Sequence, residues 1–177
     1  MKTFIGTKIV QAEKLSVSDI ADKIVNNELL TNGAIDDFLL KNDQDVLGYL
    51  VKYEDGYTSV SPADVFEEAY IATTGLSYGL AVEAARKGYA LERAGWNGKG
   101  LYMFLISGSP FNLGCSLLSD DVNRLLARDM ASIIAPHFAL KTSSGTIQPG
   151  WVASVSDTLA TDWQIVRLDL NETVMAE

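Results

Sequence analysis

The sequence has one cysteine and one histidine, His137, among its 177 residues. A single cysteine cannot form a disulfide within the chain, so we expect a reducing compartment such as the cytoplasm. One cysteine and one histidine are too few to supply an ordinary transition-metal site. A nucleophilic triad would have to use His137, which follows Ala135-Pro136 in a segment without the glycines of a nucleophile elbow. We therefore expect no metal, no cofactor and no catalytic residues.

Positive charge is also scarce, because 14 Lys and Arg residues stand against 23 Asp and Glu, which gives a net charge of −9. Such a surface repels the phosphate backbone of DNA and RNA, so we expect no nucleic-acid partner. No apolar run is long enough to cross a bilayer, and the first residues lack the apolar core of a signal peptide. A small anionic ligand stays compatible with this composition, since a few backbone N–H groups and one or two cations can bind phosphate.

Hydrophobic residues make up 47% of the chain and charged residues 21%, a composition typical of a folded protein with a buried core. Residues 1–74 carry 6 Lys or Arg and 13 Asp or Glu, a charge of −7, so the remaining residues carry −2 of the total of −9. This shift indicates a boundary between two modules, residues 1–72 and residues 75–177. We expect an α+β protein, with small antiparallel sheets and short packed helices.

The first module contains a strong hairpin signal. Two β-rich runs, Leu47–Tyr53 and Tyr57–Val60, flank the turn sequence Asp55-Gly56. Ser61 and Pro62 follow, and they favour a helix with Ser61 as its N-cap and Pro62 as its first residue. The sequence therefore predicts a hairpin followed directly by a helix.

The second module shows helix and strand signals in alternation. Ser77 can cap a helix that Gly88 ends, and Leu101–Ile106 is an almost wholly apolar strand. A second hairpin is predicted across Thr142–Gly145. Between these strands, the spacing of apolar residues predicts a helix over 117–135.

Three glycines lie within the six residues Gly95-Trp96-Asn97-Gly98-Lys99-Gly100. Glycines expose backbone N–H groups and let the backbone approach a ligand closely. Trp96 offers a flat face for a nucleobase, and Asn97 can bond a base edge or a ribose hydroxyl. Lys99 and the nearby Arg93 can supply positive charge for phosphate. Because Asn-Gly is also a common hairpin-turn sequence, a purely structural turn is the alternative.

A second polar stretch lies between Trp151 and Trp163. Ser154, Ser156 and Asp157 would stand at a helix N-terminus beside these aromatic rings. Asp157 could be taken with Asp162 for an acid–base pair, but residues five positions apart do not share a helix face. The alternatives are a polar wall of a binding site and an ordinary capped helix between two core tryptophans.

Two motifs together resemble a small phage domain, the second Thoeris anti-defence family. The first is Ala94-Gly95-Trp96-Asn97-Gly98-Lys99-Gly100, followed by an apolar strand and Gly108-Ser109-Pro110-Phe111. The second runs from Lys141 to Ser154 and continues through Ser156-Asp157-Thr158-Leu159-Ala160-Thr161-Asp162-Trp163. The resemblance covers about residues 75–168, and the helix predicted over 117–135 is an insertion relative to the family.

The resemblance implies a binding protein and not an enzyme. Members of the family sequester gcADPR, the cyclic ADP-ribose signal of the Thoeris immune system, and some are thought to hold cyclic dinucleotides. The family implies a homotetramer with pockets between subunits, in the cytoplasm of an infected or lysogenic host. Carried over to this sequence, the ligand-binding residues would be Trp96, Asn97, Gly98, Lys99, Trp151, Ser154 and Asp157.

The first module resembles a short module found on phage and prophage proteins, to which the resemblance attaches no activity. Its matching segments are Met1–Lys8 and Gly56–Tyr70, and Val60 stands where the module more often has tryptophan. Two other functions stay open from the sequence. One is a nucleotide-processing enzyme that uses Asp157 or His137, and the other is a phage interaction module whose acidic first part docks a host protein.

Overall fold

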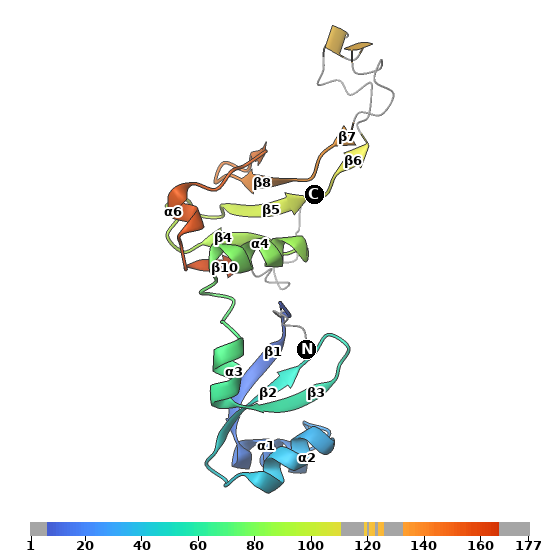
Figure 1. Cartoon of the computed structure of the whole chain (residues 1–177), viewed down its shortest axis with the longest axis vertical. Helices are drawn as coiled ribbons and strands as arrows, with labels where there is room; N and C mark the ends of the chain where they lie inside the picture. Colours follow the sequence, from blue (N-terminus) through green and yellow to red (C-terminus); the bar gives the residue numbers. More distant parts are fainter. Residues whose placement is uncertain (1–6, 111–118, 120, 123, 126–132, 167–177) are drawn as a thin grey trace, which may run out of the picture. The chain divides into compact units, whose positions relative to one another are not determined.

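The computed structural model describes residues 7–110, 119, 121, 122, 124, 125 and 133–166 (Figure 1). The chain divides into two compact units, Met1–Ala72 and Thr73–Glu177. Both units combine short helices with antiparallel sheets, so the α+β fold class expected from the sequence is confirmed. Within the described ranges, no helix has both the length and the apolar character that crossing a bilayer requires.

The first unit is a three-stranded antiparallel sheet in the order β1-β2-β3, with three helices. Its elements are β1 (Gln11–Ser16), α1 (Val17–Val25), α2 (Gly33–Lys41), β2 (Leu47–Lys52), β3 (Thr58–Pro62) and α3 (Ala63–Ala69). The core of this unit forms where α1 and α2 bury Val17, Ile20, Ile35 and Phe38.

The predicted hairpin is confirmed, because β2 pairs with β3 and Gly56 occupies the turn at a φ of 85°. The predicted cap of the next helix is wrong by one residue. Pro62 is the N-cap of α3, no side chain hydrogen-bonds the first turn, and the Ser61 hydroxyl contacts the Pro62 carbonyl instead. Ser61 and Pro62 both pair with β2, so the strand continues through them. Ser61 therefore belongs to the sheet and is not the helix cap.

The second unit has a five-stranded antiparallel sheet in the order β10-β4-β5-β8-β9 and a two-stranded pair, β6-β7. Its elements are α4 (Tyr78–Arg86), β4 (Leu91–Arg93), β5 (Tyr102–Ile106), β6 (Ser109–Pro110), β7 (Ile133–Ile134), β8 (His137–Lys141), β9 (Ile147–Pro149), α6 (Val155–Thr158) and β10 (Trp163–Ile165). The hairpin predicted across Thr142–Gly145 is confirmed as β8-β9.

Helix α4 packs against the β10-β4-β5 side of this sheet (Figure 1). Ser77 caps the helix through the Leu80 N–H, and Gly88 follows its end at a φ of 93°, as the sequence predicted. The helix buries three alanines, whose small side chains allow close approach to the strands. Beneath them the sheet buries Leu91, Met103, Ala139 and Trp163.

The helix predicted over 117–135 is wrong at its C-terminal end. Ile133 and Ile134 form β7, which pairs with Ser109 and Pro110 of β6. Isoleucine favours extended backbone, and Pro136 disfavours helix in the residue before it. Within this segment the described residues Asp121, Val122, Arg124 and Leu125 are helical, and the rest of the predicted helix lies outside the described residues.

Candidate functional site

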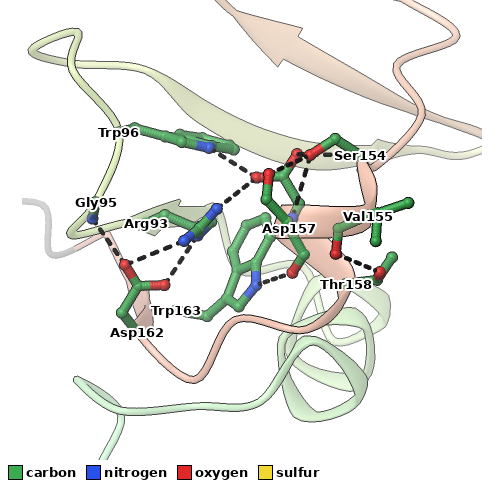
Figure 2. A network of polar contacts seen from close by, with 10 residues as sticks. Arg93, Gly95, Trp96, Ser154, Val155, Asp157, Thr158, Asp162 and Trp163 are labelled. Atoms are coloured by element: carbon green, nitrogen blue, oxygen red, sulfur yellow. Dashed lines mark hydrogen bonds and ion pairs between the residues drawn. The ribbon is translucent and has the colours of Figure 1, made fainter.

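Arg93 stands between two carboxylates that come from the second motif (Figure 2). Its Nη1 donates to Asp157 Oδ1 at 2.8 Å, and its Nε donates to Asp162 Oδ1, also at 2.8 Å. The side chains of Arg93 and Asp157 are 16% and 11% exposed, so this ion pair is largely shielded from water. Both ends of the guanidinium are therefore held by protein groups.

Strand pairing explains this arrangement. In the antiparallel pairing of β4 with β10, Arg93 lies opposite Trp163. Asp162, the residue before Trp163, therefore lies beside the arginine. The same carboxylate accepts the Gly95 N–H through Oδ2 at 2.8 Å, which holds the start of the β4–β5 loop. A Cβ at Gly95 would lie 2.8 Å from that oxygen, so the backbone can approach the carboxylate only because this residue is glycine.

Asp157 is fixed from its own side by a capping box. The Ser154 hydroxyl and the Ser154 backbone N–H both donate to Asp157 Oδ2, at 2.6 and 3.0 Å, and Ser154 accepts from the Asp157 N–H. The other oxygen, Oδ1, accepts from Arg93 and from the indole N–H of Trp96 at 3.0 Å. Every acceptor direction of this carboxylate is thus directed at an N–H or O–H of the protein (Figure 2).

These contacts set the charge of the site. Burial alone would raise the pKa of Asp157, but the hydrogen bonds from Ser154, Arg93 and Trp96 outweigh it and lower the pKa from 3.8 to about 2. The hydrogen bonds from Arg93 likewise lower the pKa of Asp162. Both carboxyl groups are ionised at neutral pH, whereas a general acid needs a raised pKa. The pair is therefore arranged to hold Arg93 in place and not to donate protons.

Three tryptophans form an aromatic cluster beside this network. The ring centroids of Trp96 lie 5.3 Å from Trp163 and 6.0 Å from Trp151, with interplanar angles of 74° and 78°. Trp163 is fully buried and donates its indole N–H to the backbone carbonyl of Asp157 at 2.9 Å. Trp96 and Trp151 are only partly buried, so each keeps ring surface that protein atoms do not cover.

The β4–β5 loop continues from Trp96 to Gly100 along the edge of this cluster. Asn97 and Lys99 are exposed on it, and Gly100 adopts a φ of 68°, a conformation that favours glycine. Lys141, from the end of β8, donates to the Gly100 carbonyl at 3.0 Å. The tip of the loop therefore rests against β8.

The structure brings four of the seven predicted site residues together: Trp96, Trp151, Ser154 and Asp157. The other three, Asn97, Gly98 and Lys99, follow on the adjoining loop. Sequence reasoning placed Arg93 near phosphate, but its guanidinium is engaged by two carboxylates. The second motif contains both Asp162 and Lys141, but the sequence did not indicate Asp162 as a partner of Arg93 or Lys141 as a residue of the site. No local pattern points to either residue, because both contacts depend on which strands are neighbours.

His137 makes a local contact. Its Nδ1 lies 2.8 Å from the Ala135 carbonyl, within the same strand entry. Among the described residues, no group of three or more His, Cys, Asp or Glu side chains could hold a metal ion. The described part of the second unit instead gathers hydroxyls, an amide side chain, lysines and aromatic rings around the two motifs.

Comparison with known proteins identifies a family over the part of the chain that contains both motifs. The family model of the Thoeris anti-defense 2-like domain matches residues 76–166. Thoeris anti-defense 2 of Bacillus phage SP01 is 34% identical over 97 residues, which cover 52% of this chain and 97% of the relative. The family-model match lies within the second unit, where the hydrogen bond from Trp96 to Asp157 joins the two motifs. The chain belongs to the Thoeris anti-defense 2-like family of phage proteins.

Proposed function

We propose that the second unit binds gcADPR, the cyclic ADP-ribose signal of Thoeris immunity, and sequesters it without cleaving it. The observation that carries this proposal is the meeting of the two motifs at Asp157, where Trp96 of the first motif and Ser154 of the second bind one carboxylate. Family membership supports the anti-defence role in general, and the residues at the site support a nucleotide as the ligand.

The site residues divide into two groups in this proposal. Asn97, Gly98 and Lys99 lie on the loop, and we expect them to contact the ligand directly through an amide side chain, backbone N–H groups and an ammonium. The partly exposed rings of Trp96 and Trp151 supply surface for the adenine base. Ser154 and Asp157 hold Trp96 in position, so they act on binding through the ring.

Sequestration needs affinity without turnover, and the electrostatics of the site support that outcome. Asp157 and Asp162 have lowered pKa values, so neither is suited to protonate a leaving group at neutral pH. A rigid, pre-arranged set of donors binds its ligand with little loss of conformational freedom, which favours tight binding. The alternative of a nucleotide-processing enzyme needs a proton donor, which two ionised carboxylates do not supply, or a free nucleophile. Both oxygens of Asp157 already accept hydrogen bonds from the protein.

Two features inferred from the family are part of the proposal. The protein would act as a homotetramer, and it would also accept cyclic dinucleotides. Three apolar side chains near α6 are strongly exposed, since Val152, Val155 and Leu159 are 84%, 76% and 77% exposed. A second copy of the chain packed against them would remove this apolar surface from water. Light scattering of the purified chain measures its mass and tests the tetramer.

The decisive experiment is a calorimetric titration of the full chain with gcADPR, and then with cyclic dinucleotides. We expect tight binding of gcADPR, and heating of the complex should release the ligand intact. Recovery of a cleaved ligand by chromatography would indicate an enzyme. If none of these ligands gives a heat of binding, sequestration is rejected. Asn97→Ala should weaken binding because it removes an exposed donor, whereas Glu83→Gln, at a half-buried position of α4, serves as the control.

A further inference from the structure

The cations of the second unit fall into two classes. Among the described residues of this unit, the paired cations are Arg86 with Glu83, Arg93 with Asp157 and Asp162, and Arg124 with Asp121. No carboxylate oxygen of the described residues lies within 4.0 Å, the limit for a salt bridge, of Lys87, Lys99 or Lys141. In a chain with a net charge of −9, lysines without a carboxylate partner are candidates for binding an anionic ligand.

Two of these lysines belong to one place in the fold. Lys141 reaches from the end of β8 to the carbonyl of Gly100 at 3.0 Å, and Gly100 is the residue that follows Lys99. A Cβ at Gly100 would lie 3.5 Å from Lys141 Nζ, an ordinary van der Waals distance, so the ammonium lies directly beside this residue. Lys141 of β8 therefore reaches the part of the β4–β5 loop that carries Lys99.

The environment of Lys141 holds its ammonium in position. The Nζ atom lies 5.4 Å from the centroid of the Tyr102 ring, the cross-strand partner of Lys141 on β5. A cation over an aromatic face is attracted by the ring and loses part of its freedom before any ligand arrives. The bond to Gly100 uses one of the three N–H donors of the ammonium, which leaves two for an anion.

Arg93 does not fill this role. Its guanidinium donates to Asp157 and to Asp162, and the ion pair with Asp157 is largely shielded from water. A phosphate at Arg93 would have to displace a carboxylate from that pair, at the cost of leaving a buried charge without a partner. The positive charge for a phosphorylated ligand is therefore expected from other cations of the second unit.

We propose that Lys99 and Lys141, with the backbone of Gly98–Gly100 between them, form the subsite for the diphosphate of the bound nucleotide. This inference rests on the proposed function, since it assigns the ligand's phosphate end to one end of the site. Lys141 lies outside the predicted binding residues, and it enters the site only through the β5-β8 pairing. The adenine base and the riboses would then lie toward Trp96 and Trp151.

The test is the affinity of the full chain for gcADPR in four forms: the wild type, Lys141→Gln, Lys99→Gln and Lys87→Gln. A charge-assisted hydrogen bond to phosphate is worth enough that each of the first two substitutions should weaken binding about 10- to 100-fold. Each should also make the affinity less sensitive to salt, because one cation fewer meets the phosphates. Lys87→Gln removes an unpaired lysine at the C-cap of α4 and should leave both the affinity and its salt dependence unchanged.

A purely structural role of Lys141 predicts a different pattern. If the lysine only anchors Gly100, its loss lowers the melting temperature and weakens every ligand equally, without changing the salt dependence. Lys99→Gln separates the two cases, because the Lys99 side chain is exposed and its removal should not affect folding. Affinity within twofold of the wild type in both Lys99→Gln and Lys141→Gln would overturn the subsite and leave the proposed function in place.

Binding of inorganic pyrophosphate is a second test of the subsite, and it does not depend on gcADPR. It carries the same diphosphate chemistry, so we expect weak binding to the wild type that Lys141→Gln and Lys99→Gln abolish and Lys87→Gln retains. If the wild type fails to bind gcADPR but binds pyrophosphate in this lysine-dependent way, the proposed function falls and the subsite stands. If neither ligand binds, or if pyrophosphate binds equally to all four forms, the subsite is rejected.

Discussion

Arg93 and Asp157 lie 64 positions apart in the sequence, and their side chains meet at 2.8 Å. This ion pair joins the strand that begins the first motif to the helix of the second motif. Asp157 also accepts the indole N–H of Trp96, so a single carboxylate fixes both the scaffold and a ring of the candidate site. The stability of the second unit and the geometry of its binding surface are therefore expected to change together when this carboxylate is altered.

Asp157→Ala should destabilise the second unit by about 3 kcal/mol, because it leaves the largely buried Arg93 with only one of its two carboxylates. The three tryptophans of the chain all lie in this unit, so tryptophan fluorescence during urea unfolding reports on it alone. Glu83→Ala, which breaks the exposed pair with Arg86, is the matched control and should cost no more than about 0.5 kcal/mol. Equal effects of the two substitutions would contradict the importance of the buried pair.

The stability of the second unit should fall in acid through Asp157. The pKa of Asp157 is about 2 in the folded protein. In the unfolded chain the carboxyl group has its ordinary pKa of 3.8, so the unfolded state binds the proton more tightly. The contribution of about 2 kcal/mol is fully present above pH 4 and is lost as the pH falls toward 2. Urea unfolding at a series of pH values measures the slope, and Asp157→Asn should make it shallower. If Asp157→Asn does not change how steeply the free energy of unfolding falls between pH 4 and pH 2, the acid sensitivity belongs to other carboxylates.

Trp96→Phe should distinguish the contribution of the aromatic ring of Trp96 from that of its indole N–H group. The substitution keeps an aromatic side chain beside Trp163 but removes the donor to Asp157, a hydrogen bond to a charged group worth about 1.5–3 kcal/mol. We expect lower stability, a higher pKa of Asp157 and weaker ligand binding, measured by urea unfolding, NMR titration of the carboxyl group and calorimetry. Unchanged stability and an unchanged pKa would show that the indole N–H does not support the carboxylate.

Gly95→Ala should disturb the site through Asp162. The new Cβ would lie 2.8 Å from Asp162 Oδ2, closer than real Cβ contacts allow, and the carboxylate would have to leave either the Gly95 N–H or Arg93. We expect a loss of about 1–3 kcal/mol in the free energy of unfolding and weaker ligand binding. Gly75→Ala is the control, because its nearest neighbour, the Thr161 carbonyl, is 3.9 Å away. A similar small loss in both variants would argue against the tight packing of Asp162 on Gly95.

The site could be predicted from sequence only as two separate stretches. The resemblance selected Trp96 and Ser154 within their motifs, but nothing in either motif indicated that Asp157 binds both of them. Arg93 stood beside the glycine loop and was assigned to phosphate for its charge. The structure pairs it with Asp157 and Asp162, because the order β10-β4-β5 makes the last described strand a neighbour of β4.

Local interactions within a few residues were determined by the sequence itself. Asp55-Gly56 specifies a hairpin turn, and Ser77 and Gly88 delimit α4, because caps and turns satisfy backbone groups of their immediate neighbours. The β6-β7 pair and the contact of Lys141 with Gly100 were decided only by tertiary structure. Such contacts depend on which strands pair across long stretches of chain, and that choice follows from burial of the whole core and not from any local pattern.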